Sequence, residues 1–125
     1  MNSVLSLFTP EFANAHPELL IEREQQLFAN PPQSRGLVGH YDADLGHDSQ
    51  GRLGQITAPT LITYGTLDLA TLPAYNQTVF EQLPNAEVHV FEGAGHLPFS
   101  EFPDEFNAVT LDFLTRHPIA DTRRK

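Results

Sequence analysis

Apolar residues change their spacing near residue 55, and this change divides the chain into two parts. Before that point, apolar residues recur at helical intervals between polar stretches. After it, two short runs rich in β-branched residues alternate with two amphipathic segments. Short apolar runs bounded by proline and glycine are typical of strands in a parallel sheet. The pattern therefore predicts an α/β fold, in which a helical part is followed by strand, helix, strand and helix.

Three helices are predicted in the first part of the chain. Pro10, preceded by the capping residue Thr9, and Pro17 mark two helix starts, because proline suits the first helical position. The second of these helices continues over 18–30, and a third, shorter helix is predicted over 36–48. The apolar residues of the second helix share one face, and they are Leu20, Ile21, Leu27 and Phe28.

The second part predicts two parallel strands. Residues 59–65 form the first predicted strand, which reads as buried on both faces, and a loop follows over 66–72. A helix is predicted over 73–83, the second strand over 86–91, and another loop over 92–100. Because a helix joins the two strands, the order implies a right-handed parallel crossover.

The final helix has the clearest boundaries. Pro103 opens it and Pro118 ends it, with acidic residues in the first turn and basic residues in the last. Those charges complement the helix dipole. Its apolar stripe consists of Phe102, Phe106, Val109, Phe113 and Leu114.

Composition narrows the classes of function. The formal net charge of −9 disfavours nucleic acid and anionic membranes as partners, because like charges repel. The absence of cysteine excludes disulfides and thiolate nucleophiles, and it is compatible with a cytoplasmic location. Residues 1–8 carry no Lys or Arg and do not resemble a signal peptide, and no apolar run is long enough to span a membrane.

Two chemically useful side chains follow the two predicted strands. Asp68 lies in the loop after the first strand and His96 in the loop after the second. Ligands and catalytic groups collect on such loops in open parallel sheets. An imidazole that acts as a general base needs an acceptor at its second ring nitrogen, and Asp68 is well placed to supply it. Gly93 and Gly95 allow the sharp turn that would present the histidine.

These residues belong to a longer pattern. Residues 53–68 contain I-x-x-P-T-L-x-x-x-G-x-x-D, residues 93–96 read G-x-G-H, and E-x-P follows at Glu101. This pattern resembles the C-terminal portion of the α/β-hydrolase superfamily. The resemblance implies that Asp68 is the triad acid and His96 the triad base, with no cofactor and with small esters or lactones as substrates.

The resemblance also implies a division of the chain. Residues 7–48 resemble more loosely the helical lid of small esterase-like or lactonase-like members. We therefore expect a lid remnant over 1–52 and the C-terminal part of the hydrolase core over 53–125.

The family's nucleophile is the residue that this pattern lacks. The family places it in a G-x-S-x-G elbow that precedes the lid, and none of the serines here lies in such an elbow. We therefore expect the chain to begin inside the lid and to need a complementary N-terminal half, or to self-associate. The serines are Ser3, Ser6, Ser34, Ser49 and Ser100.

Simpler interpretations exist for the same residues. Asp68 alone would be a loop aspartate that caps a turn, and His96 alone a structural histidine. Their occurrence together at the family's spacing favours the triad roles. Glu101 is interpreted as an acid near the N-terminus of the final helix, rather than as a site residue. Ser100 is too close to His96 in sequence to form an elbow, and it is not favoured as a nucleophile.

A metal site is the weaker alternative for residues 40–48. On a helix, His40, Asp44 and His47 would share a face, which suits zinc or nickel. A solvated helix face explains the same pattern and is preferred.

The predicted function is that of a fragment of a hydrolase for small esters, lactones or similar substrates. The alternative is a non-catalytic module that docks on a partner, because a two-stranded sheet leaves an apolar edge unpaired. A third interpretation, a reading frame whose product has no function, stays open on the sequence alone.

Overall fold

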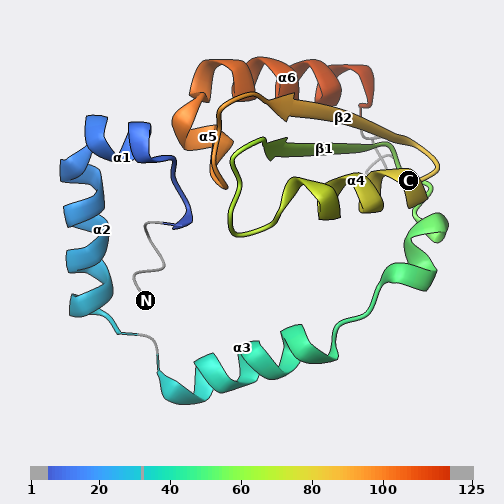
Figure 1. Cartoon of the computed structure of the whole chain (residues 1–125). Coiled ribbons are helices and arrows are strands. Elements are labelled where there is room, and N and C mark those ends of the chain that lie inside the picture. The colour runs from blue at the N-terminus through green and yellow to red at the C-terminus, as the bar shows by residue number, and fades with distance from the viewer. Residues whose placement is uncertain (1–5, 32, 119–125) are drawn as a thin grey trace, which may run out of the picture.

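The centre of the fold is a pair of parallel strands, β1 (Thr60–Gly65) and β2 (Ala86–Phe91). The computed structural model describes residues 6–31 and 33–118. Along the pair, Thr60 lies opposite Ala86 and Gly65 lies opposite Phe91. Figure 1 shows the sheet between helix α4 (Pro73–Gln82), which connects the strands, and helix α6 (Pro103–Arg116). The predicted α/β fold class is confirmed, and so is the order of its last four main elements.

The loop predicted over 92–100 contains a short additional helix, α5 (Pro98–Glu101), directly before α6. Pro98 and Pro103 each stand at the start of one of these helices. Proline at a helix start explains why the chain turns sharply between α5 and α6.

The core lies where the sheet meets α6 and the segment before α1. Phe91, at the end of β2, is 1% exposed, and its ring lies 6.0 Å from that of Phe106 on α6. Prediction and structure differ at β1, which is half-buried over most of its length rather than buried on both faces. Within the described residues each face of the sheet packs against one main helix, and one helix leaves many strand residues partly exposed to solvent. The buried apolar residues are Phe8, Leu53, Phe91, Ala94 and Phe113.

The helices before the sheet form an arc that leaves the sheet and returns to it (Figure 1). They are α1 (Pro10–Ala15), α2 (Pro17–Ala29) and α3 (Ser34–Gly46), followed by the 3₁₀ helix η2 (Gln50–Gln55). The prediction of a shorter third helix was wrong, because α3 has 13 residues, as many as α2. Both ends of α3 lie two residues before the predicted bounds of 36–48. Gly36 and Gly39 lower helix propensity at its start, which explains why the sequence pattern places the start too late.

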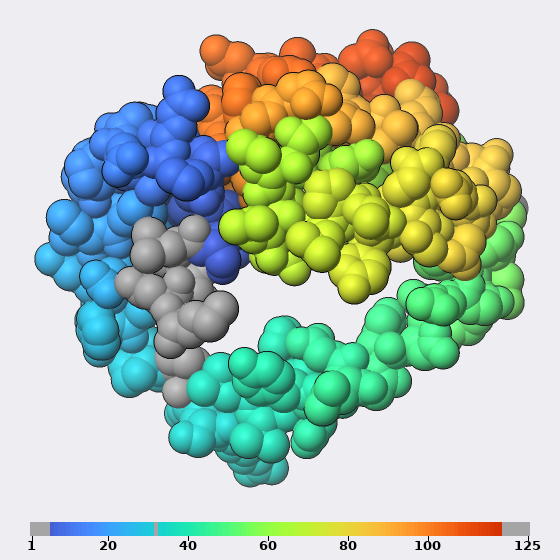
Figure 2. All heavy atoms as spheres, viewed as in Figure 1, coloured from blue at the N-terminus to red at the C-terminus, as the bar shows by residue number. Residues whose placement is uncertain are grey.

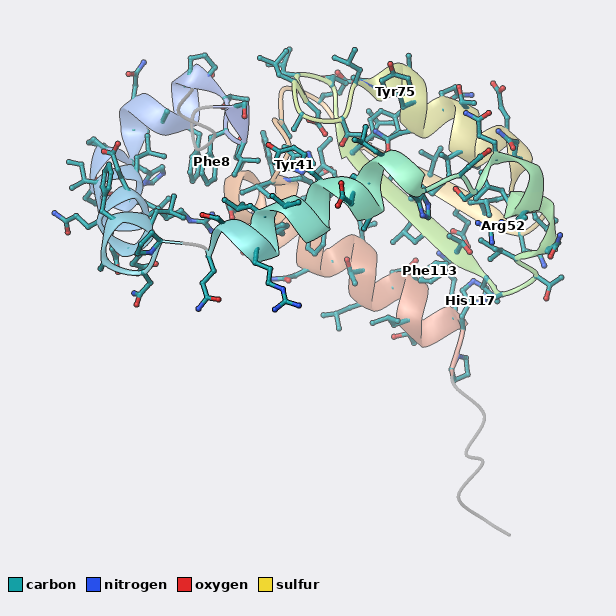
Figure 3. The ribbon with its side chains drawn as sticks, turned by 90° about the horizontal axis from the view of Figure 1, so that it is seen from below. Phe8, Tyr41, Arg52, Tyr75, Phe113 and His117 are labelled. Carbon is teal, nitrogen blue, oxygen red and sulfur yellow. The ribbon has the colours of Figure 1, made fainter. Side chains whose placement is uncertain are left out.

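The arc leaves much apolar surface uncovered. Figure 2 shows an open space between α3 and α4. Tyr41 of α3 and Tyr75 of α4 are 67% and 65% exposed, and Figure 3 labels both. No helix in the described part of the chain has the length and apolar character that crossing a bilayer requires.

Candidate active site

The loops after β1 and β2 both leave the sheet at the carboxyl ends of the strands, and they bring Asp68 and His96 together. The Nδ1 atom of His96 lies 2.9 Å from the Oδ2 atom of Asp68. The two loops also bond to each other, since the backbone N–H of Leu67 donates to the carbonyl of Ala94 at 2.9 Å. The parallel register of the strands therefore determines the proximity of two residues that are 28 positions apart.

Asp68 is held from both sides. Its carboxylate is 4% exposed, and Oδ1 accepts hydrogen bonds from the backbone N–H groups of Ala70 at 2.8 Å and Thr71 at 2.9 Å. The turn-capping role and the pairing with His96 thus occur together, one on each carboxylate oxygen. A buried carboxylate with both oxygens bonded cannot rotate without losing these partners, so it orients the imidazole.

A close approach of backbones brings the two loops into contact. A Cβ atom on Gly65, the last residue of β1, would overlap the carbonyl oxygens of Ala94 and Gly95. Only glycine allows the loop that carries His96 to lie directly over the end of β1. Gly93 in the same loop has a φ of 79°, a left-handed conformation that glycine adopts without strain. We call residues 92–97 the histidine loop.

The other side of the histidine loop contacts the segment before α1. The backbone N–H of His96 donates to the carbonyl of Leu7 at 3.1 Å. Glu101 accepts from the backbone N–H and from the hydroxyl of Thr9, both at 2.9 Å. We call residues 7–9 the entry segment.

The interpretation of Glu101 as an acid that serves only the helix dipole was therefore incomplete. Its carboxylate joins two segments that are far apart in sequence. The sequence signals that could have suggested this contact are weak, namely the capping residue Thr9 and the E-x-P pattern.

The ring of His96 is available on its outer side. Its side chain is 34% exposed, and its Nε2 atom is hydrogen-bonded to none of the described residues. Ser100 lies in α5, where its N–H bonds to the carbonyl of Leu97, and no hydrogen bond between described residues joins it to His96. The arrangement can accept a proton at Nε2 while Asp68 stabilises the imidazolium that results.

The residues considered as a metal site do not converge. His40 Nε2 and Asp44 Oδ2 lie 3.7 Å apart on the exposed surface of α3, and His47 is the C-cap residue of that helix. Over residues 6–31 and 33–118, no three His, Asp or Glu side chains gather in a way that would hold a metal ion.

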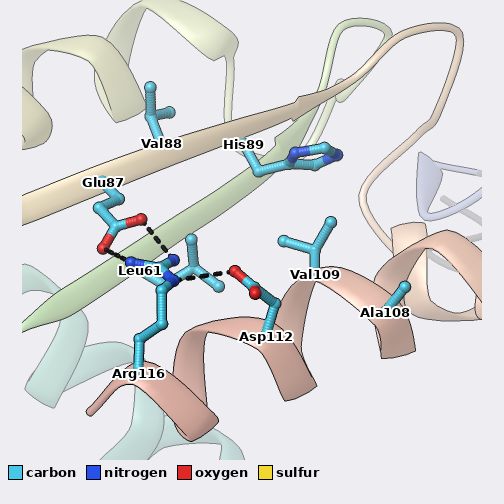
Figure 4. A pocket seen from close by; sticks show the side chains of 8 residues that line it. All are labelled: Leu61, Glu87, Val88, His89, Ala108, Val109, Asp112 and Arg116. Atoms are coloured by element: carbon cyan, nitrogen blue, oxygen red, sulfur yellow. Dashed lines mark hydrogen bonds and ion pairs between the residues drawn. The ribbon is translucent and has the colours of Figure 1, made fainter.

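A second cluster of charges lies away from Asp68 and His96, in a pocket of about 330 Å³ between β2 and α6 (Figure 4). The two terminal guanidinium nitrogens of Arg116, Nη1 and Nη2, donate to Glu87 at 2.7 Å. These hydrogen bonds, followed by one from His117, lower the pKa of Glu87 from 4.5 to about 2. The pKa of Arg116 is raised, first by Glu87 and then by Asp112. The cluster connects β2 to the end of α6, which is a structural role.

Comparison with known proteins agrees with this geometry. The sequence profile described as "Alpha/beta hydrolase family" matches residues 3–109. A 2-hydroxy-6-oxo-6-phenylhexa-2,4-dienoate hydrolase of Comamonas testosteroni is 32% identical over 116 residues, which are 91% of this chain and 41% of the relative. A proline iminopeptidase of Lactobacillus helveticus is 41% identical over 66 residues, which are 53% of this chain and 22% of the relative.

Solved structures give the same result. The enol-lactonase from Burkholderia xenovorans LB400 superimposes with a TM-score of 0.79 at 26% identity, over 91% of this chain and 43% of the lactonase. The chain thus spans less than half the length of these relatives. On the profile match and on the full strand–helix–strand–helix order, the chain belongs to the α/β-hydrolase family.

Proposed function

We propose that this chain supplies the acid and the histidine of a nucleophile–histidine–acid triad, in a hydrolase for small esters, lactones or similar substrates. The observation that carries the proposal is the 2.9 Å contact between Asp68 Oδ2 and His96 Nδ1, with Asp68 buried and its other oxygen bonded to the backbone. The named relatives are a dienoate hydrolase, an iminopeptidase and an enol-lactonase. They support hydrolysis as the reaction without selecting one substrate.

In the proposed mechanism His96 moves the proton. Its Nε2 accepts the proton of a nucleophile, supplied by a segment of the G-x-S-x-G type, as that nucleophile attacks the substrate carbonyl. The same nitrogen then returns the proton to the leaving group. Asp68 keeps the Nδ1–H tautomer in place through both steps. No metal or cofactor takes part in this scheme.

We also propose that residues 1–52 act as a cap and residues 53–125 as part of the core. Figure 1 shows α1 to α3 set apart from the sheet, whereas η2 leads directly into β1. Leu53 in η2 is buried, whereas α1, α2 and α3 contain no buried residue, so the proposed boundary lies after the three exposed helices. Apolar residues on the inner side of such a cap would shape the substrate pocket.

The test is a chimaera in which this chain replaces the matching segment of a well-expressed relative. Hydrolysis of short-chain p-nitrophenyl esters is measured for the chimaera and for its His96→Gln and Asp68→Asn variants. We expect activity that falls by about 10³-fold or more in the histidine variant, because the triad works as a unit. A chimaera that unfolds cooperatively but is inactive, or whose activity is unchanged by His96→Gln, would refute the proposal.

The 125-residue chain alone is the matching control. We expect it to hydrolyse no ester above the blank. Activity of the chain alone that disappears in His96→Gln would indicate a nucleophile within it, and Ser100→Ala would then be the first variant to examine.

A second candidate function is a non-catalytic module that depends on a partner. The observation that favours it is the exposed apolar surface of the arc, where Phe28 is 79% and Leu45 86% exposed. Within the described residues the sheet has two strands, so both of its outer edges lack a neighbouring strand. Such surface favours association with a complementary segment or with a second copy. Sedimentation over a range of concentrations tests this, and a monomer at all concentrations would contradict it.

A further inference from the structure

One carboxylate joins the entry segment to the histidine loop. Glu101 Oε1 accepts from the N–H of Thr9 at 2.9 Å, and Oε2 accepts from the Thr9 hydroxyl at 2.9 Å. Oε2 also accepts a longer hydrogen bond, 3.4 Å, from the N–H of Gly95. Three donors from two distant segments therefore converge on one half-buried side chain. Hydrogen bonds to a carboxylate are stronger than those between neutral groups, so this junction is well suited to fix a loop.

The packing at the junction leaves little room for another arrangement. A Cβ atom on Gly95 would lie 2.9 Å from Glu101 Oε1, 3.1 Å from the nitrogen of Thr9 and 3.2 Å from the carbonyl oxygen of Leu7. Thr9 is itself 6% exposed, and its hydroxyl caps α1 by accepting from the N–H of Phe12 at 3.2 Å. The contacts of Thr9 and Glu101 therefore connect three segments, namely the start of α1, the entry segment and the histidine loop.

His96 is held at two points, and one of them depends on this junction. Its ring bonds to Asp68, and its backbone N–H donates to Leu7, two residues before Thr9. Displacement of Thr9 would move Leu7, and the backbone of His96 would lose its acceptor. The imidazole would then have to reach Asp68 from a less constrained backbone.

We propose that Glu101 is a positioning residue for His96, which acts through Thr9 and Leu7 rather than by touching a substrate. The inference rests on the proposed role of His96 as the triad base. It makes the placement of that base dependent on the docking of the entry segment, and hence on the position of the cap. Asp104 provides the contrast, because it is an exposed acid in the first turn of α6, where a carboxylate favours the helix dipole.

The test uses the full chain with isotope-labelled histidine and follows two protons of His96 by NMR. These are the ring proton on Nδ1, which faces Asp68, and the backbone amide proton, which faces Leu7. His96→Gln assigns the signals. The readout is the exchange rate of each proton with water, compared with global stability from denaturant unfolding.

Glu101→Ala is expected to raise both exchange rates by about tenfold or more, since a lost charge-assisted bond shifts a local opening equilibrium by that order. The matched control Asp104→Ala is expected to change them by less than about twofold. Thr9→Val removes the hydroxyl's bond to Glu101 and its cap of α1, but it keeps the bond from the backbone N–H to Glu101. It is expected to give an intermediate rise. If Glu101→Ala prevents folding, Thr9→Val carries the test alone, and unchanged His96 signals in it would overturn the inference.

Two outcomes separate this inference from the proposed function. If Glu101→Ala changes the His96 protons no more than Asp104→Ala does, the positioning role is wrong and the triad proposal stands. If the wild-type chain shows no protected Nδ1 proton, and Asp68→Asn leaves the ring signals unchanged, the pairing of His96 with Asp68 fails first. The proposed function then falls, and the positioning role falls with it.

Discussion

The carboxyl edge of the sheet and the helices of the arc differ in how their side chains are held. At the sheet edge, Asp68 is 4% exposed, and both of its oxygens are hydrogen-bonded within the described chain. On α2, Phe28 is 79% and Ile21 is 55% exposed, although both lie on the apolar face of that helix. The buried carboxylate at the carboxyl end of the sheet therefore finds all its hydrogen-bond partners in the two loops there. The arc, in contrast, presents apolar surface that the described residues do not cover.

This difference follows from the two kinds of element. In a parallel pair, the register fixes where both loops begin, so two short loops suffice to bring Asp68 and His96 together. An amphipathic helix gains most of its stability from packing its apolar face against something else. For this reason the two loops alone can bring the proposed acid–base pair together, whereas the apolar faces of the arc need further surface to pack against.

The largest expected effect separates the two regions by stability. Phe91→Ala should lower the free energy of unfolding by about 3–5 kcal/mol, because it empties the site of a fully buried ring. Phe28→Ala should change it by no more than about 0.5 kcal/mol, because that ring is largely exposed. Denaturant unfolding followed by circular dichroism measures both.

The pair of substitutions also tests the state of the arc. A loss of several kcal/mol in Phe28→Ala would mean that α2 is covered in solution. A loss that grows with protein concentration would identify the cover as a second copy of the chain.

A pair of glycines gives the next largest effect. Gly65→Ala should destabilise the chain by about 1–3 kcal/mol, because its methyl group overlaps the carbonyl oxygens of Ala94 and Gly95. Gly39→Ala, in the middle of α3 with no atom near the added Cβ, should stabilise the chain by about 0.5–1 kcal/mol. Thermal and denaturant unfolding give the sign of each change.

The same substitution should disturb the site. Because the histidine loop would have to move away from β1, Gly65→Ala is also expected to weaken the protection of the His96 ring proton. Equal effects of the two glycine substitutions on that proton would contradict the close approach at Gly65.

The elements that sequence predicted well are those defined by local signals. Short runs rich in β-branched residues marked both strands, and prolines at positions 10, 17, 73 and 103 stand at the start of helices. The order of the strands then placed Asp68 and His96 at one edge. Burial was predicted less well. The apolar pattern of β1 indicated burial on both faces and that of α2 indicated a packed face, but the described residues cover neither fully.

The contact that the sequence did not reveal is the bond between Glu101 and Thr9. It joins residues 92 positions apart, and neither residue is unusual in its local context. Threonine before a helix and glutamate near one are each explained by capping or by the dipole. A tertiary hydrogen bond of this kind becomes visible only when the fold brings the entry segment against the histidine loop.

The smallest expected effect concerns the ion pair between Glu87 and Arg116. Each of these side chains has several hydrogen-bond partners, as Asp68 has, but both are partly exposed to solvent. Because the pKa of Glu87 is lowered from 4.5 to about 2, the pair stabilises the fold above about pH 4.5. Its contribution is lost as the pH falls from there toward about 2. The two side chains are 42% and 44% exposed, so the contribution is small and salt weakens it further.

Glu87→Gln should therefore show a small loss of stability near neutral pH that fades as the pH falls below about 4.5. The control Asp104→Asn, at an exposed acid in the first turn of the same helix as Arg116, removes a charge without removing this ion pair. Denaturant unfolding at low and high salt measures the difference between the two variants. A loss that persists at low pH and at high salt would mean that Glu87 is shielded from water in solution. A further segment or partner would then cover the pocket between β2 and α6, as it would the apolar faces of the arc. The sheet and the arc would then differ only in how much of each is left uncovered by the described residues.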